Sequence, residues 1–316
     1  MKPLLFTVNS EFDGLPLSAA LFVPDNPRAL VLFSHGMCEH KQRYFPLMEH
    51  LAGLGLVCAA ADHRGHGQSV RSAQDLGFFG PDGQGAEGLL RDLHQIAGLL
   101  RARFPGLPLF LFGHSMGSLA ARCYARRWDS DLSGLIVCGS PSYNPAAEAG
   151  LALCRVLARF AGPRHRSLFI HRMMFGSFNR AFGRPQESAW LCSDPAVVRR
   201  YDEDPLCGFV FTLNGFESLL LLMRECYTKK GWAVSSPDMP VLFISGAQDP
   251  CRISDRHFFR AVELMRSLGY RHVGQKLYPG LRHEILNEPC PDVWSDVSNA
   301  LLAWSGADTF EIAPGV

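Results

Sequence analysis

Short, almost wholly apolar runs alternate with longer amphipathic stretches along most of this chain. The apolar runs lie at 30–34, 56–60, 109–112, 135–138 and 241–245. Such runs are typical of buried β-strands. Between them, patterns with helical spacing cover stretches at about 43–53, 86–104, 116–127 and 254–268. This alternation predicts an α/β fold in which a mostly parallel sheet carries helices on both faces.

Two segments depart from this rhythm. The runs at about 4–8 and 17–23 alternate between apolar and polar residues, which favours an antiparallel pair at one edge of the sheet. Between 141 and 238 no strand–helix pair is legible, and the helical patterns near 147–161 and 214–229 stand alone. We therefore expect a core domain formed by 1–140 and 239–316, with 141–238 inserted as a helical cap above the carboxyl ends of the strands.

Composition narrows the function classes. The chain has 316 residues, a formal net charge of +1 and 47% hydrophobic residues, so a folded globular protein is expected and nothing indicates a nucleic-acid partner. The ten cysteines form no CxxC pair and no metal-ligand spacing, which predicts free thiols and no metal or other cofactor. Without a recognisable signal peptide or bilayer-spanning run, a cytoplasmic location is expected. Oligomeric state is not predicted.

The candidate nucleophile lies in the motif Gly113-His114-Ser115-Met116-Gly117, between a predicted strand and a predicted helix. This is the context in which G-x-S-x-G forms the sharp turn of a serine hydrolase. The turn strains the serine backbone and lifts its oxygen clear of the sheet, and the two glycines allow strand and helix to approach closely. Ser115 is therefore the predicted nucleophile.

A serine hydroxyl needs a base and an orienting acid, which in this fold follow in the order Ser, Asp, His. Asp249 comes just after the strand at 241–245, and His283 follows the next strand-like run, at 273–278. Both positions project to the carboxyl edge where Ser115 emerges. Asp255 lies in a helical pattern and Asp238 precedes a strand, so both are weaker candidates.

The oxyanion hole needs two backbone N–H groups. One comes from the residue after the nucleophile, Met116, and the other from the loop after an early strand. There the chain reads Leu-Phe-Ser-His-Gly-Met, so Gly36 gives the loop its freedom and Met37 is the predicted second donor.

Several motifs together resemble the family of monoacylglycerol lipases and lysophospholipases, which includes serine aminopeptidase-like members. SHGMCEH at 34–40 and DHRGHGQS at 62–69 are similar to two of its loops. GHSMGS at 113–118 and LYPGLRHEILNEP at 277–289 are similar to its elbow and histidine loop. DPLCGFVFT at 204–212 resembles the cap of bacterial members.

The resemblance implies a capped α/β-hydrolase fold and cofactor-independent hydrolysis of acyl esters. It supports the triad and the oxyanion donors, and it implies supporting roles for Glu39 and His40. Where many relatives continue the elbow with Gly-Gly, this chain has Gly117-Ser118. The family includes esterases, amide hydrolases and peptidases that act on N-terminal residues, so it does not fix the substrate.

The predicted cap is rich in Phe and Met at 168–182, which suits both packing onto the core and an acyl-chain pocket. The favoured hypothesis is a serine hydrolase for carboxylic esters of single-chain lipids, with reversible membrane-surface contact through the cap. Two alternatives stay open. One is an amide or peptide hydrolase with the same triad, and the other is a non-catalytic binding protein that has kept the fold.

Overall fold

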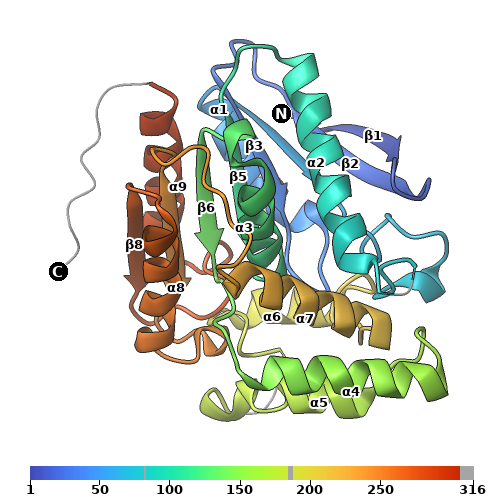
Figure 1. Ribbon diagram of the computed structural model, residues 1–316. Coiled ribbons are helices and arrows are strands. Elements are labelled where there is room, and N and C mark those ends of the chain that lie inside the picture. The colour runs from blue at the N-terminus through green and yellow to red at the C-terminus, as the bar shows by residue number, and fades with distance from the viewer. Residues whose placement is uncertain (82, 184–187, 307–316) are drawn as a thin grey trace.

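Eight strands form one sheet at the centre of the molecule (Figure 1). The structure is a computed structural model that describes residues 1–81, 83–183 and 188–306. The strand order is β1-β2-β4-β3-β5-β6-β7-β8. The strands are β1 (Leu4–Asn9), β2 (Pro16–Phe22), β3 (Ala29–Ser34), β4 (Leu56–Ala61), β5 (Leu109–His114), β6 (Gly134–Cys138), β7 (Val241–Gly246) and β8 (Val273–Tyr278).

The pairing confirms a mostly parallel sheet with an antiparallel edge. β1 pairs with β2, and β2 with β4, in antiparallel orientation, whereas all other neighbours are parallel. The central strands β3, β5, β6 and β7 are buried along their whole length, as their continuous apolar sequences predict. In register, Ser34 lies beside Gly113 and His114 beside Cys138, so the carboxyl ends of three strands meet at one edge.

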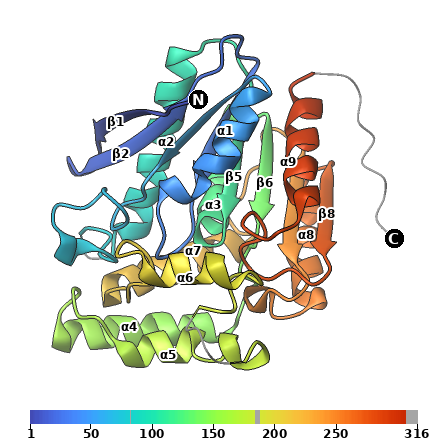
Figure 2. The same cartoon turned by 180° about the vertical axis from the view of Figure 1, so that it is seen from behind.

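Helices cover both faces of the sheet (Figures 1 and 2). α1 (Phe45–Gly53) and α9 (Pro291–Trp304) contribute to one buried apolar cluster, with residues such as Leu51 and Val297. α2 (Gly85–Arg103), α3 (Met116–Trp128) and α8 (Asp255–Leu268) contribute to the other, with residues such as Leu93 and Phe258. α1, α2, α8 and α9 each bury one apolar face against the sheet, whereas residues 116–125 of α3 are all buried because α7 packs on its other side.

Four helices lie between β6 and β7 in the described part of the chain. They are α4 (Ala146–Ala161), α5 (Leu168–Phe175), α6 (Pro195–Glu203) and α7 (Leu213–Tyr227). They gather at the carboxyl ends of the strands, with α4 and α5 farthest from the sheet (Figure 1). α7 buries Phe216, Leu219 and Leu222 in the same apolar cluster as Tyr124 of α3. The last helix of this segment is therefore anchored on the core.

Three helices are absent from the predictions made from the sequence, namely α5, α6 and α9. Each has a recognisable start. The side chains of Ser167 and Asp194 accept hydrogen bonds from the first turns of α5 and α6, and Pro195 and Pro291 occupy the first positions of α6 and α9. The predicted helix at 43–53 begins as a short 3₁₀ turn, Lys41–Tyr44, before α1.

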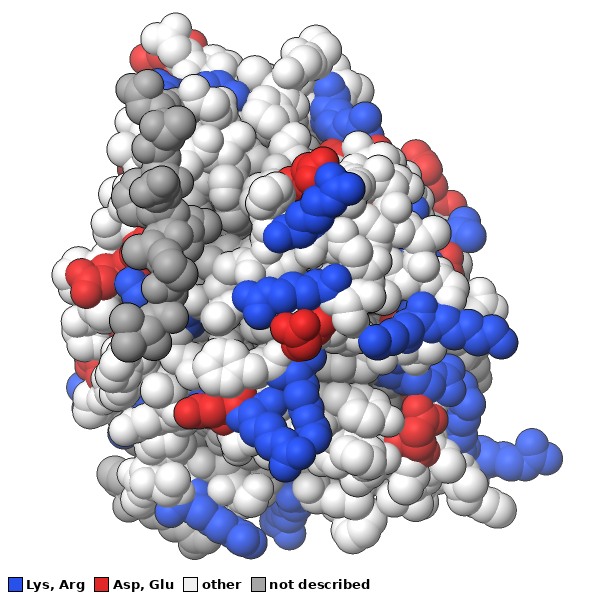
Figure 3. All heavy atoms as spheres, turned by 60° about the vertical axis from the view of Figure 1, so that its left-hand side comes forward, with Lys and Arg blue, Asp and Glu red and all other residues white. Residues whose placement is uncertain are grey.

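The surface has mixed charge. In the view of Figure 3, Lys and Arg side chains are interspersed with Asp and Glu, and pairs such as Lys276–Asp296 and Arg271–Asp238 lie within ion-pair distance. Of the helices that the structure describes, none combines the length and the apolar character that crossing a membrane requires.

Candidate active site

The candidate nucleophile Ser115 occupies the turn between β5 and α3. Its backbone has φ 52° and ψ −120°, a conformation that residues other than glycine rarely adopt. The Ser115 N–H donates to the carbonyl of Cys138 at 2.9 Å, and the Ser118 hydroxyl donates to the Ser115 carbonyl at 2.6 Å. The neighbouring strand and the first turn of α3 therefore hold the strained turn in place.

Steric crowding requires glycine at both glycine positions of the motif, Gly113 and Gly117. A Cβ at Gly113 would lie 2.5 Å from the carbonyl oxygen of Gly117, and a Cβ at Gly117 would lie 2.0 Å from that of Ser34. Both obstacles are backbone atoms, which cannot move without shifting β3 or α3. The absence of a side chain is therefore what lets α3 begin against the end of β3.

The candidate base and acid come together at the same edge. The carboxylate of Asp249 lies with Oδ2 3.0 Å from Nδ1 of His283. The Ser245 hydroxyl donates to Oδ2 at 3.1 Å, and the Cys251 N–H donates to Oδ1 at 2.8 Å. With Nδ1–H directed at the carboxylate, Nε2 of His283 is left as the basic nitrogen. His283 and Ser115 line one cavity, whereas Asp249 lies behind the histidine.

The candidate oxyanion donors also face this cavity. Met116 is the first residue of α3, and Met37 comes directly after Gly36 in the loop that follows β3. Within the described residues, neither of these backbone N–H groups donates to a protein acceptor. Two uncommitted N–H groups beside a serine, one of them at a helix N-terminus, suit a developing oxyanion.

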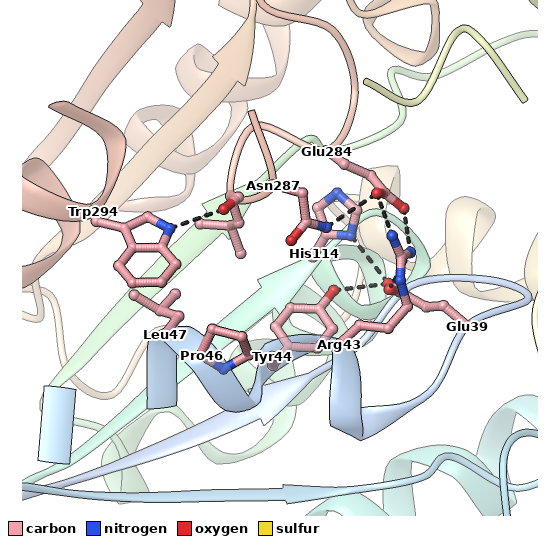
Figure 4. Close-up of a pocket in the computed structure, with 10 residues that line it drawn as sticks. Glu39, Arg43, Tyr44, Pro46, Leu47, His114, Glu284, Asn287 and Trp294 are labelled. Carbon is pink, nitrogen blue, oxygen red and sulfur yellow. Dashed lines mark hydrogen bonds and ion pairs between the residues drawn. The ribbon is translucent and has the colours of Figure 1, made fainter. Parts of the chain in front are cut away.

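The Glu39 carboxylate holds the oxyanion loop in place through hydrogen bonds. Its Oε1 accepts hydrogen bonds from the Gly36 N–H at 2.5 Å and the Tyr44 hydroxyl at 2.7 Å, and it lies 3.3 Å from Nδ1 of His114 (Figure 4). Burial works to raise the pKa of Glu39, but His114 and Arg43 outweigh it and hold this pKa far below its ordinary value. Glu39 is therefore a buried carboxylate that fixes the loop.

His114 links this carboxylate to the candidate base. Burial works to lower the pKa of His114, yet the hydrogen bond and charge of Glu39 raise it above its ordinary value. Nε2 of His114 lies 3.3 Å from the carbonyl oxygen of His283, and the two rings are 4.8 Å apart. A protonated His114 can therefore donate to both sides and hold the His283 backbone in position.

Arg43 joins the oxyanion loop to the histidine loop. Its guanidinium forms a two-pronged ion pair with Glu284, in which Nη2 lies 2.6 Å from Oε2, and its Nη1 lies 3.2 Å from Oε2 of Glu39 (Figure 4). Glu284 directly follows His283, so the ion pair also fixes the chain on which the candidate base is carried.

His40 lies away from the nucleophile. Its Nε2 is 2.9 Å from Oδ2 of Asp204 in the segment after α6, and its Nδ1 is 2.5 Å from Oε1 of Gln42. It therefore joins the oxyanion loop to the inserted helical segment and makes no direct contact with the triad positions.

The cavity above Ser115 has a volume of about 1030 Å³. Its lining combines the site with residues of α4, α5 and α7, and its exposed lining is mainly apolar. The apolar side chains that line it include Leu153, Leu168, Ile170, Met173, Met174, Phe175, Phe178, Phe209, Leu219, Leu220 and Met223. The size and apolar lining of this cavity suit an extended apolar ligand.

Three buried histidines lie behind the oxyanion loop. The backbone N–H of His63 donates to the ring nitrogen Nε2 of His35 at 2.8 Å, and the rings of His35 and His63 are 4.4 Å apart. Burial holds the pKa of His35 well below its ordinary value and lowers that of His63 to about 3 and that of His66 to about 4. These histidines are neutral at pH 7 and form part of the packing.

The sequence reasoning missed five residues that hold the site. Arg43 and Tyr44 follow the oxyanion loop, Glu284 follows the candidate base, Ser245 is the penultimate residue of β7, and the Trp190 ring packs 4.9 Å from that of His283. In the sequence, Glu284 directly follows His283, Arg43 and Tyr44 come three and four residues after His40, and Ser245 precedes Asp249 by four. No such proximity indicates Trp190. Only the fold shows that these neighbours meet.

The fold and this edge of the sheet define an α/β-hydrolase. The family model described as serine aminopeptidase, S33, matches residues 25–290, and the chain belongs to this family.

Named relatives extend the comparison. The chain is 26% identical to the monoacylglycerol lipase of Mycolicibacterium smegmatis over 285 residues, covering 87% of this chain and 89% of the relative. It is 28% identical to the monoglyceride lipase of Homo sapiens over 294 residues, covering 92% and 87%. A thermostable carboxyl esterase from Bacillus coagulans, solved in complex with glycerol, aligns with a TM-score of 0.85 and 28% identity, covering 97% and 98%.

The first prediction concerns Gly117. We expect Gly117→Ala to destabilise the protein by at least about 2 kcal/mol, because its Cβ would overlap the Ser34 carbonyl. Gly98→Ala on α2 is the matched control, because no atom outside its own helix lies within 4 Å of the added Cβ and alanine favours the helix. Urea unfolding measures both variants, and equal stability of the two would contradict the steric argument.

The second prediction concerns acid stability. His63 and His66 have pKa values of about 3 and 4 in the folded protein, well below the ordinary 6.5, because burial disfavours the charged rings. Between pH 6.5 and about 4 the unfolded chain therefore binds protons that the folded chain does not. The free energy of unfolding should fall as the pH is lowered through this window.

His66→Phe tests the origin of this effect. The ring is already surrounded by Phe79, Phe209 and Phe211, so a phenyl group fits the site chemically. In this variant, the free energy of unfolding should depend less steeply on pH. The slope should be smaller than that of wild type by up to about 1.4 kcal/mol per pH unit. His272→Asn, at an exposed histidine, is the control. A slope that stays at the wild-type value in His66→Phe would contradict the assignment.

Proposed function

We propose that this protein is a serine hydrolase that cleaves carboxylic esters of single-chain lipids, of the monoacylglycerol or lysophospholipid type. The observation that carries the proposal is the serine turn opening into a large apolar cavity, in a chain whose relatives are named as monoglyceride lipases. The proposed catalytic residues are Ser115, Asp249 and His283.

In the proposed reaction, Nε2 of His283 takes the proton of the Ser115 hydroxyl as its oxygen attacks the ester carbonyl. The backbone N–H groups of Met37 and Met116 hold the oxyanion of the tetrahedral intermediate. His283 then protonates the leaving alcohol, and water repeats the cycle on the acyl-enzyme. Asp249 keeps Nδ1 of His283 as the donor, so the imidazolium that forms is stabilised.

We propose that 141–238 acts as a cap whose inner surface holds the acyl chain. The apolar lining from α4, α5 and α7 supports this division of labour. Away from the cavity lining, α4 and α5 expose Val156, Phe160 and Phe169. These side chains would let the cap touch a lipid surface, from which a single-chain ester could enter. We also propose a cytoplasmic location, since the ten cysteines are thiols.

The family description favours a second candidate, hydrolysis at a peptide N-terminus. An aminopeptidase needs an acidic group free to bind the substrate ammonium. Two carboxylates in the cavity lining are Glu39 and Glu284, and both are paired with Arg43. This pairing favours the ester over the peptide. Comparison of kcat/KM for monoacylglycerols and aminoacyl naphthylamides separates the two, and a preference for the amides would reverse the proposal.

The third prediction tests the catalytic residues. Ser115→Ala and Asp249→Asn should each lower kcat for p-nitrophenyl esters by on the order of 10⁴-fold or more, because both remove a member of the triad. Asp255→Asn is the matched control, since Asp255 is exposed and pairs with Arg252. A fluorophosphonate probe should label wild type and Asp255→Asn, but not Ser115→Ala. Unlabelled wild type would support the non-catalytic binding protein instead.

The fourth prediction tests the acyl-chain cavity. Gly150 of α4 lines it, and a larger side chain there would project toward Leu220. We expect Gly150→Leu to lower kcat/KM for long-chain esters by at least about 10-fold while short esters are hydrolysed as before. Ala152→Leu, on an exposed position of the same helix, is the control. An equal loss for all chain lengths would show that the side chain disturbs the reacting groups rather than the chain.

A further inference from the structure

Three side chains outside the proposed triad bring potential metal ligands together. A ring nitrogen of His40, a carboxylate oxygen of Asp204 and the sulfur of Cys207 all lie within 4.8 Å of one another. His40 belongs to the oxyanion loop, whereas Asp204 and Cys207 follow α6 in the proposed cap. The cluster therefore spans two parts of the chain that only the fold brings together.

The turn after α6 already holds two of these groups in place. The Asp204 carbonyl accepts a hydrogen bond from the Cys207 N–H at 2.9 Å, and Oδ1 of Asp204 accepts one from the Leu206 N–H at 2.8 Å. These bonds close a tight turn that carries the carboxylate and the thiol on the same side. Oδ2 of Asp204 remains directed at the histidine.

The orientation of His40 is that of a metal ligand. Its Nδ1 lies 2.5 Å from Oε1 of Gln42, and its Nε2 lies 2.9 Å from Oδ2 of Asp204. In the tautomer that donates Nδ1–H to Gln42, the lone pair of Nε2 faces the carboxylate. Histidines that bind a metal usually donate their other ring N–H to such an acceptor, which fixes the tautomer. Two acceptors that face each other at this distance require a proton or a cation between them.

Charge and access also favour a cation. The carboxylates near the cluster are Glu39, Glu284 and Asp204, and the cations paired with Glu39 and Glu284 are Arg43 and His114, so negative charges outnumber positive ones. The surroundings are therefore net negative. Cys207 is buried, but the Asp204 side chain is 31% exposed, so an ion can enter from solvent past the carboxylate.

We propose that His40, Asp204 and Cys207 form a binding site for a transition-metal cation of the Zn²⁺ type. A thiolate, an imidazole and a carboxylate are the donors that zinc takes, whereas calcium and magnesium take oxygen alone. On binding, the Cys207 thiol releases its proton to solvent and the sulfur bonds to the metal. Water completes a tetrahedral set in which ligand atoms lie about 2.0–2.3 Å from the metal.

This site would join the cap to the oxyanion loop. The Cys38 carbonyl of that loop already accepts hydrogen bonds from the Tyr201 hydroxyl at 2.9 Å and from the Gly208 N–H at 3.1 Å. A metal held by His40 on one side and by Asp204 and Cys207 on the other strengthens the same junction. Zinc should therefore raise the Tm of the protein.

Cobalt(II) is the spectroscopic probe, because its absorption reports both tetrahedral geometry and a thiolate ligand. Titration of the full chain with Co²⁺ should produce visible bands and a thiolate-to-cobalt band at a stoichiometry of one metal per chain, and Zn²⁺ should displace both. Cys207→Ser should abolish the thiolate band, and His40→Gln should weaken Co²⁺ binding by at least about 10-fold. Wild type without a thiolate band would overturn the proposal.

A second cluster provides the matched control. Ligand atoms of Asp249, Cys251 and His283 also lie within 4.8 Å of one another, so a metal could compete at the proposed triad. Cys251→Ser should retain the thiolate band that Cys207→Ser loses. The reverse pattern would place the metal at the triad, and a band retained in both variants would exclude both thiols, so either result overturns the proposal.

Asp204→Asn keeps the test independent of folding. Its side chain is partly exposed, so the substitution leaves the buried thiol and the core packing unchanged. Zn²⁺ should raise the Tm of wild type but not that of Asp204→Asn. An equal rise in both would show that the carboxylate is not a ligand. None of these measurements uses substrate, so they stand apart from the proposed activity.

Discussion

The close approach of α3 to the end of β3 is the constraint on which the site depends. Ser115 can project from the sheet only if the chain reverses within one residue, and the strained φ of 52° is the consequence. The Ser34 carbonyl occupies the space that a side chain at position 117 would need. The strain is held by ordinary interactions around it, chiefly the Ser115 N–H bond to Cys138 of the neighbouring strand. The parallel register of β3, β5 and β6 thus fixes the serine, the oxyanion loop and their separation together.

A buried network of charged side chains connects the oxyanion loop to the candidate base, His283. Glu39 fixes the oxyanion loop through the Gly36 N–H, and His114 connects that carboxylate to the His283 carbonyl. Arg43 then ties Glu39 to Glu284. Each charge is buried, so each needs its partners, and removing one would leave the others uncompensated. The reacting groups are positioned by electrostatics as well as by packing.

Much of the fold was predictable because the central strands are buried on both faces and read as continuous apolar runs. The elbow and the positions of Asp249 and His283 followed from chain order and from the edge at which parallel strands end. The helix patterns did not include α9, although Val293, Val297 and Leu301 have helical spacing. The helices α5 and α6 are only eight and nine residues long, and α5 buries only Ile170, so each offers too short a pattern for a prediction from periodicity.

Long-range pairs explain what the sequence could not provide. Arg43 and Glu284 are 241 residues apart, and although Glu284 lies in the histidine loop, nothing in the sequence pairs it with Arg43. From the sequence alone, a charged residue beside a predicted catalytic position is most simply interpreted as solvent-exposed. Only the fold shows that such a residue is buried. His40 illustrates the converse: the resemblance implied a supporting role, and the structure directs its ring to Asp204 of the inserted segment.

These pairings also connect the inserted segment to the proposed chemistry. Tyr201 and Gly208 bind the Cys38 carbonyl, directly after the candidate oxyanion donor Met37, and Trp190 packs on His283. The segment that lines the apolar cavity therefore contacts both sides of the candidate site. Movement of this segment would change the oxyanion loop and the environment of the base at the same time. Because one polypeptide segment makes both contacts, the geometry of the cavity and the geometry of the reacting groups cannot vary independently.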